Sequence, residues 1–128
     1  MKSSKRVKKH ILLVEDDRHI VESLSELLEE RGYIVTKALN GQEALDLMRS
    51  SNELPDLIVL VLMLLVKDGP QFRAEQELDP RLEQIPVILM SADAQIETKR
   101  IRMGLKLQIK KPLDIDAFFQ MIERLLGT

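Results

Sequence analysis

Apolar positions along the chain fall into two patterns that alternate from one end to the other. Short unbroken apolar runs are typical of buried strands, whereas apolar residues that recur every three or four positions are typical of amphipathic helices. Unbroken runs predict strands over residues 11–14, 57–62 and 87–90. Two more strands are predicted over residues 33–38, a segment rich in β-forming residues, and over residues 107–109. The spaced pattern predicts helices over about residues 20–31, 40–48, 71–78, 96–103 and 115–126. The chain is therefore predicted to repeat a strand and a helix five times.

Residues at the predicted helix ends support these boundaries. Gly32 and Gly104 stand where helices are expected to stop, and Asn40 and Asp114 stand where helix caps are expected. Pro70 is suited to the first turn of a helix. The last helix is predicted to bury a stripe made of Ile115, Phe118, Ile122, Leu125 and Leu126.

The strands are apolar on both faces, which predicts a parallel sheet covered by helices on both sides. Right-handed crossovers leave few topologies, and the expected one is the flavodoxin-like, doubly wound (βα)5 fold of the α/β class. This fold is a three-layer sandwich with strand order 2-1-3-4-5. Its functional crevice lies beyond the carboxyl ends of the strands, so the residues that follow each strand are the candidates for a site.

Composition narrows the class of protein further. The chain has 128 residues, of which 45% are apolar and 31% charged, as expected for one soluble domain with its own core. A net charge of -2 argues against a nucleic-acid-binding body, and the absence of cysteine excludes disulfides and thiolate chemistry. The longest apolar run, residues 57–66, is shorter than the roughly 20 residues of a membrane span. We expect a basic, disordered tail over residues 1–8, a domain over residues 9–128, and a cytoplasmic location.

Polar residues follow several of the predicted strands. Glu15, Asp16 and Asp17 come after the first strand, and repulsion between neighbouring carboxylates favours a cation such as Mg²⁺. Ser91 ends the fourth strand with a hydroxyl group, and Lys111 follows the fifth with a positive charge. Acids, a hydroxyl and a lysine around one crevice suit a phosphoryl group and its metal.

The same segments resemble the receiver domain of two-component response regulators, the CheY-like family. The resemblance rests on "ILLVEDD" (11–17), "NGQEAL" (40–45), "PDLIVLVLM" (55–63), "KDG" (67–69), "IPVILMSA" (85–92) and "KKPL" (110–113), and covers about residues 9–126. It implies a phosphate site formed by Ser91, Ala92 and Lys111. It also implies that Glu15 and Asp16 hold Mg²⁺ together with the backbone carbonyl of Met63.

The chain departs from the family at the position that matters most for phosphorylation. In the family, an aspartate at the end of the third strand accepts phosphate from a histidine kinase, and the corresponding residue here is Val61. A valine side chain has no oxygen to attack phosphorus or to bind a metal. We therefore expect no phosphoryl transfer, no cofactor, Mg²⁺ binding that is weak at most, and pairing of Glu15, Asp16 and Lys111 with one another.

Further departures cluster around the same crevice and beside the fifth strand. They are Leu64, Leu65, Pro70, Leu105, Leu107 and Gln108. Three origins remain open: a natural pseudo-receiver, a laboratory redesign, and a simple inactivating substitution accompanied by local changes. The clustering, and the shift toward leucine and valine, favour the redesign.

Two functions are carried forward from the sequence. The first is a pseudo-receiver that binds a protein partner, or a second copy of itself, through helix 4, strand 5 and helix 5, the usual partner surface of the family; neither nucleic acid nor membrane is an expected partner. The second is a redesigned scaffold with an artificial apolar ligand-binding or catalytic pocket near Lys111, in which Lys110 or Lys111 forms a Schiff base. Nearby acids favour the charged ammonium over the neutral amine that such a reaction needs, so we do not expect an enzyme.

Overall fold

The computed structural model describes residues 8–62 and 67–128. The expectations for most of the basic tail and for Met63, Leu64 and Leu65 lie outside the described residues.

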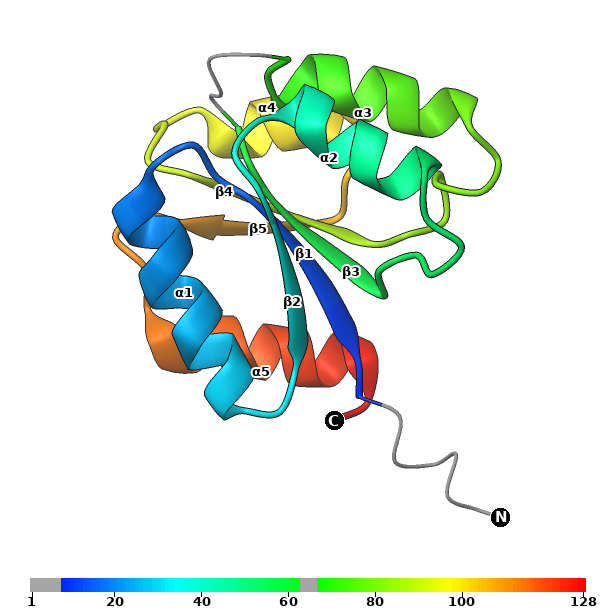
Figure 1. The fold of residues 1–128 in the computed structure, drawn as a ribbon. Helices are drawn as coiled ribbons and strands as arrows, with labels where there is room; N and C mark the ends of the chain where they lie inside the picture. Colours follow the sequence, from blue (N-terminus) through cyan, green and yellow to red (C-terminus); the bar gives the residue numbers. More distant parts are fainter. Residues whose placement is uncertain (1–7, 63–66) are drawn as a thin grey trace.

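A parallel five-stranded sheet forms the centre of the molecule (Figure 1). Its strands are β1 (His10–Val14), β2 (Ile34–Ala38), β3 (Leu57–Val61), β4 (Val87–Ser91) and β5 (Leu107–Lys110). They pair in the order β2-β1-β3-β4-β5, which confirms the predicted topology.

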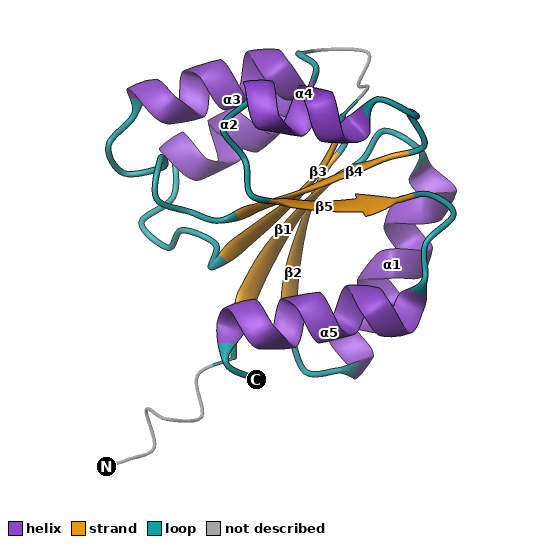
Figure 2. Ribbon diagram, turned by 180° about the vertical axis from the view of Figure 1, so that it is seen from behind, coloured by secondary structure: helices purple, strands orange, loops and turns teal. Residues whose placement is uncertain are grey.

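Helices cover both faces of the sheet, as Figure 2 shows from behind. The helices are α1 (Arg18–Glu30), α2 (Gly41–Arg49), α3 (Gly69–Leu78), α4 (Ile96–Arg102) and α5 (Ile115–Leu126). Helices α1 and α5 lie on one face, and α2, α3 and α4 on the other (Figures 1 and 2). The three-layer sandwich is therefore confirmed. Within the described residues, no helix has the length and apolar character to cross a membrane.

Side-chain caps fix where four of the helices begin. The predicted caps Asn40 and Asp114 each accept a backbone N–H from the first turn of their helix. Asp68 caps α3 in a reciprocal arrangement with Gln71. Asp17 caps α1 by accepting the N–H groups of His19 and Ile20. The sequence interpretation grouped Asp17 with Glu15 and Asp16 as acids that favour a cation, and the structure shows that the Asp17 carboxylate caps α1.

The core lies on both sides of the central strands. Every residue of β3 and β4 is buried, as a parallel strand covered by helices on both faces requires. On α5, Phe118 and Ile122 are buried as predicted, but Leu125 is 37% exposed. The prediction for Leu125 was wrong because β5 ends the sheet, so this side chain lies beside Leu107 and Met121 at an edge that no further strand covers.

Lys67, shortly before α3, lies against the start of α2. A Cβ atom added to Gly41 would overlap the backbone carbonyl oxygen of Lys67. Lys67 itself has a φ of 53°, in the left-handed region, and its amine pairs with Glu75 of α3. The glycine is therefore required by the close approach of these two backbones.

The C-terminal end of the chain is attached to the β2 side of the molecule. The hydroxyl groups of Tyr33 and Thr128 are hydrogen-bonded at 2.6 Å. The guanidinium of Arg31 lies 3.9 Å from the centre of the Phe119 ring. These contacts join the start of β2 to α5.

Candidate functional site

The residues predicted from the strand ends lie along one edge of the sheet. Val14 pairs with Leu60 in the register of β1 and β3, so Glu15 and Val61 are the next residues at that edge. Ser91 pairs with Lys110 in the register of β4 and β5. Parallel pairing thus brings the ends of four strands together, although the residues are far apart in sequence.

An ion pair joins the residue that follows β1 to the residue that follows β5. The amine of Lys111 donates to Oε1 of Glu15 at 2.9 Å. The Glu15 side chain is only 1% exposed, and that of Lys111 is 27% exposed. The second carboxylate oxygen of Glu15 accepts the backbone N–H of Asp17 at 3.3 Å. Both oxygens of the buried carboxylate are therefore engaged within the chain.

The end of β3 lies between the ends of β1 and β4, and its side chain is the hydrocarbon of Val61. Its side chain is 5% exposed at the last position of β3. Its strand neighbour in β4 is Met90, which is also buried. The side chain at position 61 therefore has no oxygen that could attack phosphorus or bind a metal. Asp16, the next acid of the predicted set, is half-buried beside Glu15.

The hydroxyl group of Ser91 is tied to the loop that follows β4. It accepts the backbone N–H of Asp93 at 2.9 Å. The carboxylate of Asp93 in turn accepts the amine of Lys99 at 2.5 Å and the backbone N–H of Gln95. The bond from Lys99, followed by the bond from Gln95, holds the pKa of Asp93 below its ordinary value. Ala92, between the two, is exposed.

Hydrogen bonds from Arg100 attach α4 to β5 and to the turn before it. Arg100 donates through Nε to the side-chain oxygen of Gln108 at 2.6 Å, and through Nη1 to the carbonyl of Leu105 at 2.8 Å. Gln108, which stands where the resemblance implies an aromatic switch residue, is therefore held by a hydrogen bond in the flank of the sheet.

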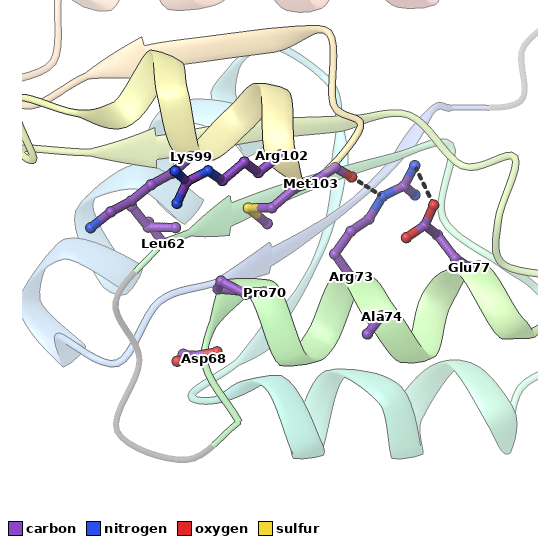
Figure 3. A pocket seen from close by; sticks show the side chains of 9 residues that line it. All are labelled: Leu62, Asp68, Pro70, Arg73, Ala74, Glu77, Lys99, Arg102 and Met103. Carbon is purple, nitrogen blue, oxygen red and sulfur yellow. Dashed lines mark hydrogen bonds and ion pairs between the residues drawn. The ribbon is translucent and has the colours of Figure 1, made fainter.

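Among the described residues, the remaining altered positions differ in how far they are exposed. Leu105 is buried, Leu107 is half-buried, and Pro70 is exposed. Leu64 and Leu65 lie outside the described residues. An apolar pocket around Lys111 also receives no support from the hollow drawn in Figure 3, because neither Val61 nor Lys111 lines it.

The donors near Glu15 are a poor match for a magnesium ion. Mg²⁺ is usually held by one or two carboxylates and several waters. Glu15 already accepts from Lys111 and Asp17, which leaves Asp16 as the one carboxylate of the predicted pair without such a bond among the described residues. In the part of the chain that the structure describes, no group of three His, Cys, Asp or Glu side chains is arranged to hold a metal.

Sequence reasoning missed Asp93, Lys99 and Arg100. They lie in the loop after β4 or in α4, a few residues beyond the strand end where site residues were expected. Asp93 lies in the loop before α4, and Lys99 follows it by six positions. That separation exceeds the three or four positions that place side chains side by side on a helix, so no regular spacing indicated the pair.

Comparison with known proteins agrees with this architecture. The family description "response regulator receiver domain" matches residues 11–123. The polar-differentiation response regulator DivK of Brucella anthropi is 34% identical over 121 residues, covering 93% of this chain and 97% of that protein. The chain belongs to the response regulator receiver domain family.

Solved structures show the same fold. A putative response regulator from Chloroflexus aurantiacus superposes with a TM-score of 0.86 at 22% identity, covering 95% of this chain and all of that one. The receiver domain of a signal transduction histidine kinase from Syntrophus aciditrophicus gives a TM-score of 0.83 at 30% identity, covering 93% and 90%. The chain is thus a two-component receiver domain with a CheY-like, flavodoxin-like fold.

Proposed function

We propose that this receiver domain acts by contact with another protein and does not accept a phosphoryl group. The observation that carries the proposal is Val61, a buried hydrocarbon side chain at the end of β3. It lies at the strand end where the family resemblance requires an aspartate. Without a carboxylate there, no acyl phosphate can form at this position.

Two polar groups of the crevice, and the side chain at the position of the family's aromatic switch, support the same interpretation because each is already bonded within the chain. Lys111 is paired with Glu15, Ser91 accepts from Asp93, and Gln108 accepts from Arg100. A phosphoryl group would have to displace these bonds. We propose for the same reason that Mg²⁺ binds weakly at most, with Glu15 held by Lys111.

The proposed contact surface is the face made by α4, β5 and α5. Ile101 is 59% exposed and Leu125 is 37% exposed, and half-buried Leu107 of β5 lies beside Leu125 of α5. Exposed apolar side chains within a charged surface are typical of partner sites. A protein partner or a second copy of the chain would bury them.

Two features favour a redesigned origin over a natural pseudo-receiver. Valine is an unusual choice for a simple loss of the acceptor, and the altered residues gather near the crevice and β5 rather than scattering. The proposed function is the same for either origin, because it depends on the side chain at position 61.

Acetyl phosphate with Mg²⁺ provides the direct test. We expect intact-protein mass spectrometry to find no phosphorylated species in the unaltered chain. Val61→Asp, which supplies the missing carboxylate, is the positive control for reagent and fold. A phosphate adduct on the unaltered chain that hydroxylamine removes, mapped to Asp16 or Asp68, would overturn the proposal.

A further inference from the structure

A hollow of about 500 Å³ lies between α3 and α4, and none of Glu15, Ser91 and Lys111 lines it. Figure 3 shows the side chains that line it, of which Leu62, Pro70, Ala74 and Met103 are apolar. Leu62 and Met103 are 1% and 7% exposed, so they form a fixed floor. Pro70 is exposed and stands at the first turn of α3. The volume falls within the range of small-molecule sites, roughly 300–1,000 Å³.

One end of the hollow is closed by a cation that is fully engaged. Arg73 donates through Nε to the carbonyl of Met103 at 2.9 Å and through Nη1 to Gln76 at 3.0 Å. Its Nη2 lies 3.8 Å from the carboxylate of Glu77. Arg73 is therefore held in place by contacts within the chain.

Two further cations line the other end. Lys99 and Arg102 project from α4 on the same side of the hollow, close to Leu62 (Figure 3). Lys99 shares its charge with Asp93. Arg102 is exposed and forms neither an ion pair nor a side-chain hydrogen bond with another described residue. Its guanidinium is free to receive an anion in a two-pronged arrangement.

An acid on the opposite wall limits how much negative charge the hollow accepts. Asp68 lines the hollow at the start of α3, where its carboxylate also caps Gln71. A ligand with two negative charges would be repelled by Asp68, whereas a single anionic group beside Arg102 would not need to approach it closely. The charges that line the hollow therefore favour a monoanion.

We propose that the hollow between α3 and α4 binds a small amphipathic monoanion, with its carboxylate or sulfonate group on Arg102 and Lys99 and its apolar body on Leu62, Pro70 and Met103. The site is independent of the proposed loss of phosphorylation, because its lining contains none of Glu15, Val61, Ser91 and Lys111. The Arg73–Glu77 pair at one end limits the length of the ligand, which favours a compact molecule over a peptide.

The probe for this site is 8-anilinonaphthalene-1-sulfonate, which joins a fused aromatic body to one sulfonate. Fluorescence titration of the whole chain is expected to give one saturable site. Amide shifts in a ¹⁵N-correlation spectrum are expected to concentrate at Leu62, Ala74 and Met103. N-phenyl-1-naphthylamine, which lacks the sulfonate, is expected to bind more weakly by roughly fivefold or more, since a hydrogen bond to a charged group is lost.

Arg102→Gln tests the anion contact, and Arg124→Gln is its matched control. Arg124 is an exposed arginine beside a smaller apolar hollow lined by Leu107, Met121 and Leu125. We expect Arg102→Gln to weaken probe binding by roughly fivefold and Arg124→Gln to leave it unchanged. A loss of affinity in Arg124→Gln instead, equal binding of the uncharged probe, or shifts that spread over the outer face of α4 at Ile101 would each overturn the proposal. The last result would indicate a surface for a macromolecule.

Discussion

The amine of Lys111 lies 2.9 Å from the carboxylate of Glu15, a residue 96 positions earlier in the chain. The two side chains meet at the carboxyl edge of a sheet in which two other strands separate β1 from β5. Because Glu15 is 1% exposed, its charge depends on this lysine and on the N–H of Asp17. The resemblance assigns Glu15 to metal binding and Lys111 to phosphate binding. In the structure the two side chains form an ion pair with each other.

Lys111→Met is expected to destabilise the fold by roughly 1–3 kcal/mol at neutral pH, because it leaves the buried Glu15 carboxylate without its cation. Lys111 is partly exposed, so water replaces some of the lost interaction and the effect stays below that of a fully buried pair. The free energy of unfolding in urea measures it.

Lys110→Met is the matched control, since Lys110 is exposed at the end of β5. Its effect is expected to stay within about 0.5 kcal/mol. Adding Glu15→Gln to Lys111→Met should restore part of the lost stability, because the amide oxygen still accepts from Asp17 and carries no charge. Equal losses from both lysine substitutions would contradict the interpretation.

If Val61 is the reason for weak Mg²⁺ binding, replacing it with aspartate should make Mg²⁺ stabilise the protein. Val61→Asp places a carboxylate next to Glu15 at a buried strand end, so it is expected to lower stability by roughly 1–3 kcal/mol without Mg²⁺. A metal site with three acids nearby should then form, and Mg²⁺ at a hundredfold excess over its Kd would restore about 2.7 kcal/mol. Thermal unfolding with and without Mg²⁺ measures both effects.

Val61→Asn separates charge from shape in that experiment. The amide is similar in size to the carboxylate but adds no negative charge, so Mg²⁺ is expected to raise its melting temperature much less. An equally large response of the unaltered chain to Mg²⁺ would show that the present donors already form a metal site.

Acid titration is expected to reveal the Asp93–Lys99 pair. The pKa of Asp93 is lowered in the folded state, chiefly by the hydrogen bond from Lys99, from an ordinary value of 3.8. The unfolded chain therefore binds the proton first as the pH falls. The contribution of Asp93 to stability is complete above its ordinary pKa and is lost as the pH falls through the folded value.

Urea unfolding midpoints between roughly pH 6 and pH 3 measure this contribution. Asp93→Asn and Lys99→Met should each make the acid side of the stability profile shallower, and the double substitution should add little more. A profile that is unchanged in both single variants would contradict the role of the pair.

Gly41→Ala is expected to destabilise the protein even though alanine is the better helix former. Helix propensity alone favours alanine by about 1 kcal/mol. The added methyl group would overlap the carbonyl oxygen of Lys67, and moving that backbone is expected to cost roughly 1–3 kcal/mol. Gln42→Ala, at the neighbouring position of α2, is the control, and its effect should stay near 0.5 kcal/mol. A stabilised Gly41→Ala variant would show that the segment at Lys67 moves freely.

The fold was predictable because it depends on local periodicity and on general rules of chain handedness. The buried runs of β3 and β4 and the caps Asn40 and Asp114 are visible in the sequence without any knowledge of tertiary contacts. The exposure of Leu125 was not predictable in the same way, since it depends on which strand lies at the edge of the sheet.

The site was predictable only at the strand ends. The pairing of Glu15 with Lys111 follows from parallel strands that finish at one edge, and the sequence interpretation expected it. The bonds from Lys99 to Asp93 and from Arg100 to Gln108 depend on the path of the loop after β4 and on the position of α4 over β5. Strand and helix periodicity carries no information on either.

The attachment of Thr128 to Tyr33 determines how the molecule can be presented to other proteins. The C-terminus lies at the end of the sheet where β1 begins, opposite the strand ends that carry Glu15 and Lys111 (Figure 1). A biotin tag or fluorescent fusion appended after Thr128 would therefore point away from both the crevice and the hollow beside α4. Immobilised on a sensor chip by that end, every copy would display the same functional side to the solution.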